Sequence, residues 1–529
     1  ASMTDPVDVL IVGAGPVGLL LACELARDGA AVRIVERSEK RTYFCKALGI
    51  TARTLEIFDS LDIAEAAIDA GLWLRGIHIH QDGKLASTFD LPIDLAAQGL
   101  PYGTLSLAQF EVERILEDCL VRHGLSVEYG HELVGFRQNA SYVDAVLHGP
   151  AGEQALRCRW LVGCDGAHSA VRHELGVAFE GDRYPETFVL GDLDLSWSLP
   201  RGPMHRFNRS AASNGGATSL AVVPIAGAAN RYRLSMIVPE GVTLSSDTPG
   251  LDELKALMLP LLPQGADLSS PRWSSTYRVS HRLAARYGVG RVFLAGDAVH
   301  IHPPVGGQGM NTGLQDAHNL AWKLALASRG AAGPALLESY EAERRPVGLD
   351  VVANTTKAMN NVLAQHAELP GFRETQLLIG YRDSTIVRDD RPDAGVARLA
   401  AGDRAPEADG LTRPFVGHAE RLHRRLGRGR HVLIGHVGDR EQLDQLADLL
   451  DHLRKALGRH AEGVAIVAAD SEIIANERIP LLHDSRGQFS ARYGVTSGTA
   501  WLIRPDGHIG WCSDRPSASG LKAYLRLIR

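Results

Sequence analysis

A glycine-rich turn between an apolar run and an amphipathic run is the feature that most restricts how this chain can fold. Residues 7–12 have the length and apolar character of a buried strand. Three glycines with GxGxxG spacing follow at once: Gly13, Gly15 and Gly18. Residues 19–28 then have helical spacing, and a second strand-like run, 31–35, ends at Glu36. This order predicts a dinucleotide-binding unit, in which glycines let the backbone approach a pyrophosphate and the acid accepts bonds from ribose hydroxyls.

A second glycine-rich segment lies late in the chain. The strand-like run 291–297 ends in Gly296-Asp297, and a loop leads to Gly309-Met310-Asn311. We expect a helix over 313–328, with Thr312 and Gln315 as a capping box and Gly330 ending it. A glycine-lined turn that enters a helix N-terminus is suited to stabilising negative charge.

A third motif lies between these two. Trp160–Cys164 is expected to be a strand, and Asp165-Gly166 follows it, with Arg172 further along the same segment. In this order, the three motifs resemble the fingerprints of the single-component (class A) FAD-dependent aromatic hydroxylases, which include para-hydroxybenzoate hydroxylase and phenol hydroxylase. The resemblance covers residues 5–395 and, more weakly, the tail.

The resemblance implies FAD as cofactor, NADPH or NADH as reductant, O₂ as co-substrate and a small aromatic substrate. Near the pyrophosphate and adenosine it implies roles for Gly13, Gly15, Gly18, Glu36, Arg37, Lys46 and Leu133. Near the flavin it implies roles for Gln109, Asp165, Asp297, Gly309, Met310 and Asn311. Arg172 matches the part of the DG segment that is implicated in nicotinamide binding. No residue is assigned as the acid or base that acts on the substrate.

The resemblance also implies the fold class, which is α/β. A Rossmann-like FAD-binding domain would comprise residues 3–80, 105–180 and 288–395. A mostly antiparallel substrate-binding sheet would comprise 81–104 and 181–287, in keeping with the strand-like runs 187–197, 217–225 and 231–238. After a turn-rich, linker-like segment at 401–410, residues 400–529 resemble the thioredoxin-like tail of phenol hydroxylase and the polyketide hydroxylases.

The tail lacks a CxxC pair, and Cys512 alone cannot carry out dithiol exchange. We therefore expect a structural or dimer-forming role for it. Its predicted elements are strands 431–434 and 463–467, a helix over 441–457 and a hairpin whose turn is Arg504–Gly507.

Basic residues of the middle segment are interpreted as solvated charges at a sheet edge. They are His205, Arg206, Arg209, Arg231 and Arg233. The histidine pairs His78/His80 and His300/His302 lack a further set of metal-ligand residues nearby in the sequence, so polar or packing roles are favoured and no metal site is expected.

Composition excludes several other classes of protein. A net charge of -6 and 22% charged residues do not fit a polybasic nucleic-acid binder, and no apolar run reaches the length of a membrane span. Six cysteines in 529 residues are too few for a disulfide scaffold, which indicates a reduced, cytoplasmic protein. Disulfide reductases would need a redox cysteine pair after the first motif, and Trp197-Ser-Leu-Pro200 lacks the second tryptophan of the halogenase signature.

The function that the resemblance implies is hydroxylation of a phenolic or other electron-rich aromatic compound through a flavin C4a-hydroperoxide. A Baeyer–Villiger or decarboxylating flavin oxygenase of natural-product biosynthesis remains an alternative, as does a non-catalytic flavin-binding module. Substrate-stimulated oxidation of NAD(P)H would separate the enzymes from the module.

Lys46 stands where the family usually has arginine, so it keeps the charge but lacks the planar fork that grips phosphate. Lys46→Arg is expected to leave the fold intact and to tighten FAD binding, because two parallel hydrogen bonds replace a point charge. Titration of FAD into the apoprotein measures this, and an unchanged affinity would place Lys46 away from the cofactor.

Overall fold

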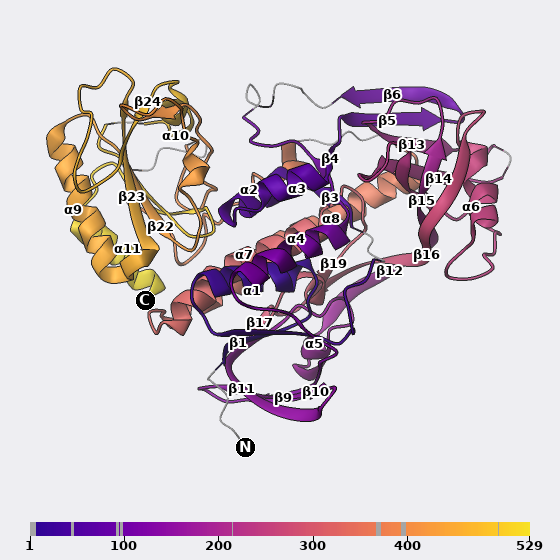
Figure 1. Cartoon of the computed structure of the whole chain (residues 1–529), viewed down its shortest axis with the longest axis horizontal. Coiled ribbons are helices and arrows are strands. Elements are labelled where there is room, and N and C mark those ends of the chain that lie inside the picture. Colours follow the sequence, from indigo (N-terminus) through magenta and orange to yellow (C-terminus); the bar gives the residue numbers. More distant parts are fainter. Residues whose placement is uncertain are drawn as a thin grey trace.

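Three large β-sheets and the helices packed against them make up the molecule (Figure 1). The computed structural model describes residues 7–43, 47–90, 95, 99–213, 215–366, 372–392, 398–495 and 497–529. Lys46 lies outside these ranges.

The first sheet carries the predicted nucleotide-binding unit. Strand β1 (Val7–Val12) pairs in parallel with β2 (Val32–Glu36) and β11 (Gly152–Gly163), and β18 (Val292–Leu294) continues the parallel part. The remaining strands of this sheet are β8 (Glu128–Tyr129), β9 (Glu132–Gln138), β10 (Val143–Gly149) and β17 (Gly288–Val289). Strand β1 is buried except at Asp8, because helices cover the sheet.

Three helices pack side by side over this sheet: α1 (Pro16–Arg27), α4 (Gln109–Arg122) and α7 (Gly309–Ser328) (Figure 1). Shorter elements surround them: α2 (Ala52–Ser60), α3 (Ala64–Ala70), α5 (Ala170–Glu174), η2 (Gly296–Ala298) and a small sheet of β3 (Gly49–Ile50), β7 (Leu105–Ser106) and β4 (Leu72–Trp73). Their apolar side chains form the largest buried cluster of the molecule.

The second sheet has the order β19-β16-β12-β15-β14-β13-β5-β6. Neighbouring strands are antiparallel except β13 and β5, which are parallel. The strands are β5 (Gly76–Gln81), β6 (Lys84–Asp90), β12 (Phe179–Ser196), β13 (Met204–Arg209), β14 (Thr218–Pro224), β15 (Arg231–Ile237), β16 (Asp267–Ala284) and β19 (His300–Ile301). Helix α6 (Leu251–Met258) and η1 (Leu259–Leu261) cover its outer face.

The third sheet belongs to the C-terminal unit, orange to yellow in Figure 1, and has the order β20-β26-β25-β22-β23-β24-β21. Its strands are β20 (Arg388–Asp389), β21 (Leu411–Thr412), β22 (His431–His436), β23 (Ala461–Ala468), β24 (Leu481–Asp484), β25 (Ala500–Ile503) and β26 (Ile509–Ser513). Helical elements of this unit are α9 (Arg440–Leu457), α10 (Gln488–Tyr493), α11 (Ala518–Ile528), η4 (Leu422–Arg424) and η5 (Gly458–His460). The short helix η3 (Phe372–Thr375) precedes the first strand of this sheet in the chain. The expected α/β fold class, with its thioredoxin-like tail, is confirmed.

Two local predictions are wrong. Helix α7 begins at Gly309 rather than Gly313, and the Thr312 hydroxyl donates back to the Gln308 carbonyl instead of capping the helix. The segment 401–410 is not a linker, because Ala401, Ala405 and Ala408 are buried in the core of the C-terminal unit. The predicted end of α7 is confirmed, since Gly330 has φ +70° just after the last turn.

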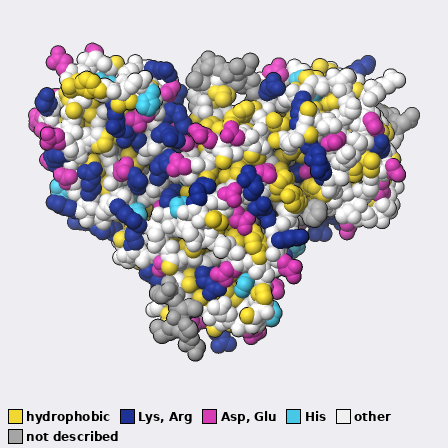
Figure 2. Space-filling model, in the orientation of Figure 1, with side chains coloured by type: hydrophobic (Ala, Val, Ile, Leu, Met, Phe, Trp, Pro, Cys, Tyr) yellow, Lys and Arg dark blue, Asp and Glu magenta, His cyan; other side chains and the backbone are white. Residues whose placement is uncertain are grey.

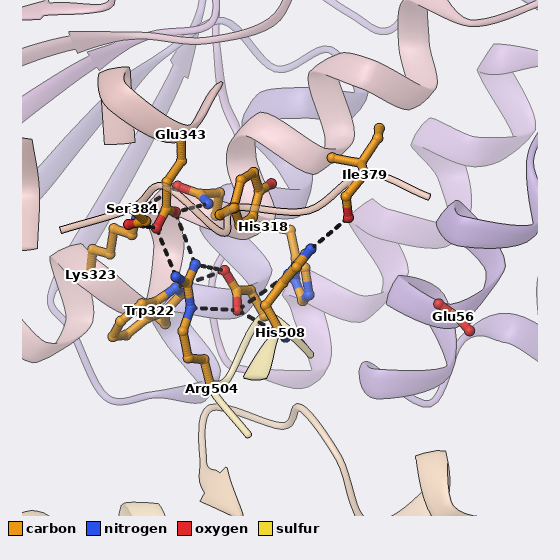
Figure 3. Close-up of polar contacts among 12 residues, drawn as sticks. Glu56, His318, Trp322, Lys323, Glu343, Ile379, Ser384, Arg504 and His508 are labelled. Carbon is orange, nitrogen blue, oxygen red and sulfur yellow. Dashed lines mark hydrogen bonds and ion pairs between the residues drawn. The ribbon is translucent and has the colours of Figure 1, made fainter. Parts of the chain in front are cut away.

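A buried cluster of charges joins the C-terminal unit to the rest of the chain (Figure 3). Glu343 lies on α8 (Pro334–Leu363), and its two carboxylate oxygens accept from the Arg504 guanidinium at 2.7 and 2.9 Å. Lys323 of α7 donates to the same carboxylate at 2.8 Å, and Asp506 pairs with the other side of Arg504. Each of these side chains is almost wholly buried.

On the face shown in Figure 2, acidic and basic side chains are interspersed. Among the described residues, no helix is both long and apolar enough to cross a membrane.

Arg504→Gln is expected to lower the free energy of unfolding by about 3–5 kcal/mol, because Glu343 and Asp506 would stay buried with less compensating charge. Denaturant unfolding measures the change. Arg478→Gln is the matched control, since Arg478 pairs with Asp448 and Asp451 on the surface of the same unit and should leave the midpoint unchanged. Equal midpoints for both variants would contradict a stabilising role for the buried cluster.

Candidate active site

A cavity of about 1640 Å³ lies between the first and second sheets. Its lining includes the start of α1, the turn after β18, the start of α7, one face of the second sheet and the C-terminal half of α8. A pocket for a single small ligand typically has a volume of about 300–1,000 Å³, so this cavity has room for more than one group.

Six of the residues that the resemblance singled out line this cavity: Gly15, Gln109, Arg172, Asp297, Gly309 and Met310. Others lie beside it without lining it: Gly13, Gly18, Glu36, Asp165 and Asn311. Arg37 is exposed and Leu133 is buried in β9, and neither lines the cavity.

The three glycines of the first turn differ in what surrounds them. Gly13 has φ +104°, and a Cβ there would lie 2.3 Å from the carbonyl oxygen of Cys164. A Cβ on Gly18 would lie 2.0 Å from the carbonyl oxygen of Gly13. Both glycines are therefore required for close packing of the turn. A Cβ on Gly15 would meet no atom within 4 Å, so this position opens onto the cavity at the N-terminus of α1.

The Glu36 carboxylate fixes the end of β2 against this turn. It accepts from the backbone N–H of Ala14 at 3.0 Å and from that of Ser38 at 2.9 Å. A carboxylate has about four acceptor sites, so two bonds of this kind leave capacity for a ligand hydroxyl.

The turn that carries Asp297 is hydrogen-bonded to a buried ion pair, Asp316–Arg344. Asp297 lies in η2 and is exposed to the cavity. Beneath it, Asp316 of α7 accepts from the Gly296 N–H at 3.2 Å, from the His300 ring at 2.7 Å and from Arg344 at 2.7 Å. Burial raises the pKa of Asp316, but the Arg344 and His300 charges outweigh it and hold the pKa below its usual value.

The first turn of α7 directs free backbone donors toward the cavity. Gly309 and Met310 line it, and the first N–H groups of a helix have no partner within the helix. The Asn311 side chain faces away and is wholly buried. Its amide donates to the Gly49 and Gly307 carbonyls, and its oxygen accepts from the Thr54 hydroxyl at 2.7 Å. Asn311 thus joins two loops behind the cavity.

The DG segment is tied to the turn after β18. Arg172 donates to the Ala298 carbonyl and to the Ala167 carbonyl, both at 2.9 Å. One oxygen of Asp165 accepts from the Val171 N–H at 3.2 Å. Its other oxygen is buried and has no partner among the described residues. A buried carboxylate oxygen without a donor is unusual in a folded protein.

Gln109 begins α4, as predicted, and its amide donates to Glu113 at 2.9 Å. Burial raises the pKa of Glu113 to about 7. This acid, which accepts from Gln109, therefore holds a proton at higher pH than an exposed carboxyl group does.

The sheet wall of the cavity was not found from the sequence. Side chains of β13 alternate, so Met204, Arg206 and Asn208 face the cavity while His205 and Phe207 face the opposite side. The interpretation of Arg206 and Arg233 as solvated edge charges is wrong, because both line the cavity in the interior of the sheet. Arg233 is held by Asp192 through bonds of 2.7 and 2.8 Å.

The histidine pairs have internal partners. The His80 ring lies 3.3 Å from His205, and His300 bonds to Asp316. His302 lines the cavity, and burial lowers its pKa to about 4, so it is neutral at physiological pH. Within the described ranges, no three His, Cys, Asp or Glu side chains form a group that could hold a metal.

Comparisons with known proteins cover almost the whole chain. Residues 6–355 match the FAD binding domain family, and residues 398–528 match the C-terminal domain of aromatic-ring hydroxylases. A flavin-dependent monooxygenase of Mycobacteroides abscessus is 33% identical over 95% of this chain and 96% of its own. Pentachlorophenol 4-monooxygenase of Sphingobium chlorophenolicum is 31% identical over 95% and 93%. The structure of aklavinone-11 hydroxylase with FAD and aklavinone is similar with a TM-score of 0.82, at 28% identity and 99% coverage of both chains.

Proposed function

Because this chain belongs to the FAD-dependent aromatic-ring hydroxylases, we propose that its large cavity holds the flavin end of FAD together with a phenolic substrate. The chain is a flavin monooxygenase that acts on aromatic compounds, with FAD as its cofactor. The proposal concerns which residues hold the cofactor and where the substrate lies. The single observation that carries it is that Gly15, Asp297 and Gly309 open onto one cavity that also has a sheet wall.

Several features of the site fit FAD. The open space at Gly15 lies at the N-terminus of a helix, where backbone donors and the helix dipole favour a pyrophosphate. The carboxylate of Asp297, which lines the cavity, can accept bonds from hydroxyl groups. The free N–H groups at the start of α7 suit the negative charge of a reduced flavin ring.

Bound FAD supplies hydride acceptance from NADH or NADPH and activation of O₂ for transfer of one oxygen atom to an electron-rich ring. The chain's own residues bind and orient. Asp316, held by Arg344 and His300, fixes the turn that presents Asp297. The apolar part of the wall, including Ile79 and Val223, excludes water from the ring that is to be oxidised.

The substrate that this wall favours is a phenol or a fused-ring phenol. Two similar proteins are named for the compounds on which they act, pentachlorophenol and aklavinone. A cavity of about 1640 Å³ admits either size beside a flavin ring.

Gly15→Ala is expected to leave apoprotein stability within about 0.5 kcal/mol of wild type, because the new methyl group meets no protein atom. It should weaken FAD binding at least ~10-fold, since the methyl group occupies the space for the pyrophosphate. Gly18→Ala is the contrasting variant. Its methyl group would meet the Gly13 carbonyl oxygen, so it should destabilise the apoprotein by about 1–3 kcal/mol. Wild-type FAD affinity in Gly15→Ala would contradict the placement of the pyrophosphate.

NAD(P)H oxidation by the FAD-loaded protein is expected to accelerate when a suitable phenol is added, and hydroxylated product should form in proportion. The assay compares NADH with NADPH, with and without each member of a panel of simple and fused-ring phenols. Oxidation that no member of the panel accelerates, at any concentration up to its solubility, would contradict the proposal that phenols occupy the cavity.

A further inference from the structure

The guanidinium of Arg206, in the wall of the cavity, has no acidic partner among the described residues. Arg206 stands in the middle of the second sheet, where β13 pairs with β5 on one side and β14 on the other. Its register neighbours are Ile79 and Ala221, so the side chain rises from an apolar part of the wall. Arg206 is half-buried, and burial lowers its pKa.

Three other arginines of this sheet have partners within the protein. Arg233 pairs with Asp192, and Arg231 pairs with Asp194. Arg209, on the same strand as Arg206, donates to the Gly215 and Gly216 carbonyls. For Arg206 alone of these four, no described residue supplies a hydrogen-bond acceptor or an acidic partner. A partly desolvated guanidinium that stays unpaired is costly unless a ligand supplies the missing acceptor.

A second set of donors lies on the same face of the strand. Asn208 follows Arg206 by two residues and also lines the cavity. Its amide oxygen accepts from the Ser219 hydroxyl at 2.9 Å. Among the described residues, none accepts a hydrogen bond from its NH₂ group. Arginine and amide donors next to each other on one strand face match the geometry of a carboxylate.

The excess of basic over acidic residues in the cavity lining also favours an anionic ligand. The lining includes eight Lys and Arg residues but only two acidic residues, Asp297 and Glu374. FAD and NAD(P)H are anionic, which accounts for part of this excess. Arg206, however, belongs to the sheet wall, away from the turns at Gly15 and Asp297 that are proposed to hold FAD.

We propose that Arg206, assisted by Asn208, binds a carboxylate carried by the aromatic substrate. The inference rests on the proposed function and narrows the substrate class to phenols that bear an acidic substituent. The Arg206 guanidinium would hold the carboxylate through two parallel hydrogen bonds and so fix which edge of the ring meets the flavin.

Equilibrium titration of the FAD-loaded protein tests this, with the change in flavin absorbance as readout. The probes are the ortho, meta and para isomers of hydroxyphenylacetate, each paired with its hydroxyphenylacetamide, which has nearly the same shape but no charge. Wild type should bind at least one acid ~10-fold or more tightly than its amide, since hydrogen bonds to charged groups contribute about that factor.

Arg206→Gln should weaken binding of that acid ~10- to 100-fold and change binding of the amide less than ~3-fold. Arg206→Lys should fall between wild type and Arg206→Gln, because it keeps the charge without the fork. The matched control is Arg209→Gln, on the same strand but bonded to backbone carbonyls, which should keep the wild-type preference. FAD content and melting temperature of each variant confirm that the site is intact.

A wild-type protein that binds no acid more tightly than its amide would overturn the inference, as would an Arg206→Gln variant that keeps the preference. These outcomes are separate from failure of the proposed function, because binding is read without turnover. If amides rather than acids accelerate NAD(P)H oxidation, that result supports the hydroxylase function and contradicts the carboxylate site.

Discussion

Two neighbouring residues of α8 connect the three parts of the molecule. Glu343 turns toward the C-terminal unit and pairs with Arg504 (Figure 3). Arg344 pairs with Asp316, which also accepts from the Gly296 N–H in the turn that carries Asp297. Further along the same helix, residues such as Thr355 and Met359 line the cavity. Because these ion pairs are buried, loss of one partner would leave the other charge buried and uncompensated. The C-terminal unit, which has no dithiol chemistry, thus contributes to the position of a cavity wall.

The cavity itself depends on close approaches that only glycine permits. At the first turn, a Cβ at Gly13 or Gly18 would meet a backbone oxygen. In the turn after β18, a Cβ at Gly296 would lie 2.9 Å from the Val17 side chain of α1. These contacts bring two segments, far apart in the sequence, to the edge where parallel strands end and helices begin. A site with helix N-termini on one side and a sheet wall on the other can favour negative charge at the cofactor and shelter an aromatic ring.

Local patterns in the sequence predicted the parts of the site that are built from consecutive residues. The strand, glycine turn and helix around Gly15 follow from spacing alone, and Gln109 begins a helix as expected. The start of α7 was misplaced because Gly309 is a poor helix former. Asn311 instead holds that first turn through bonds to the distant loop at Gly49 and Thr54. The segment at 401–410 resembles a linker in composition, yet its backbone bonds to the β25–β26 hairpin, as from Ala405 to Gly507. The side on which Arg206 lies could not be predicted, because it depends on the pairing of β13 with β5, which comes much earlier in the chain.

The central claim is that one cavity takes the flavin ring at the start of α7 and an acidic phenol against the sheet wall. A crystal structure of the FAD-loaded protein soaked with a hydroxyphenylacetate tests it most directly. We expect the flavin ring beside Gly309 and Met310, the substrate ring between it and β13, and the carboxylate on the Arg206 guanidinium. A substrate ring bound outside this cavity, or a carboxylate directed away from Arg206 toward solvent, would contradict the account.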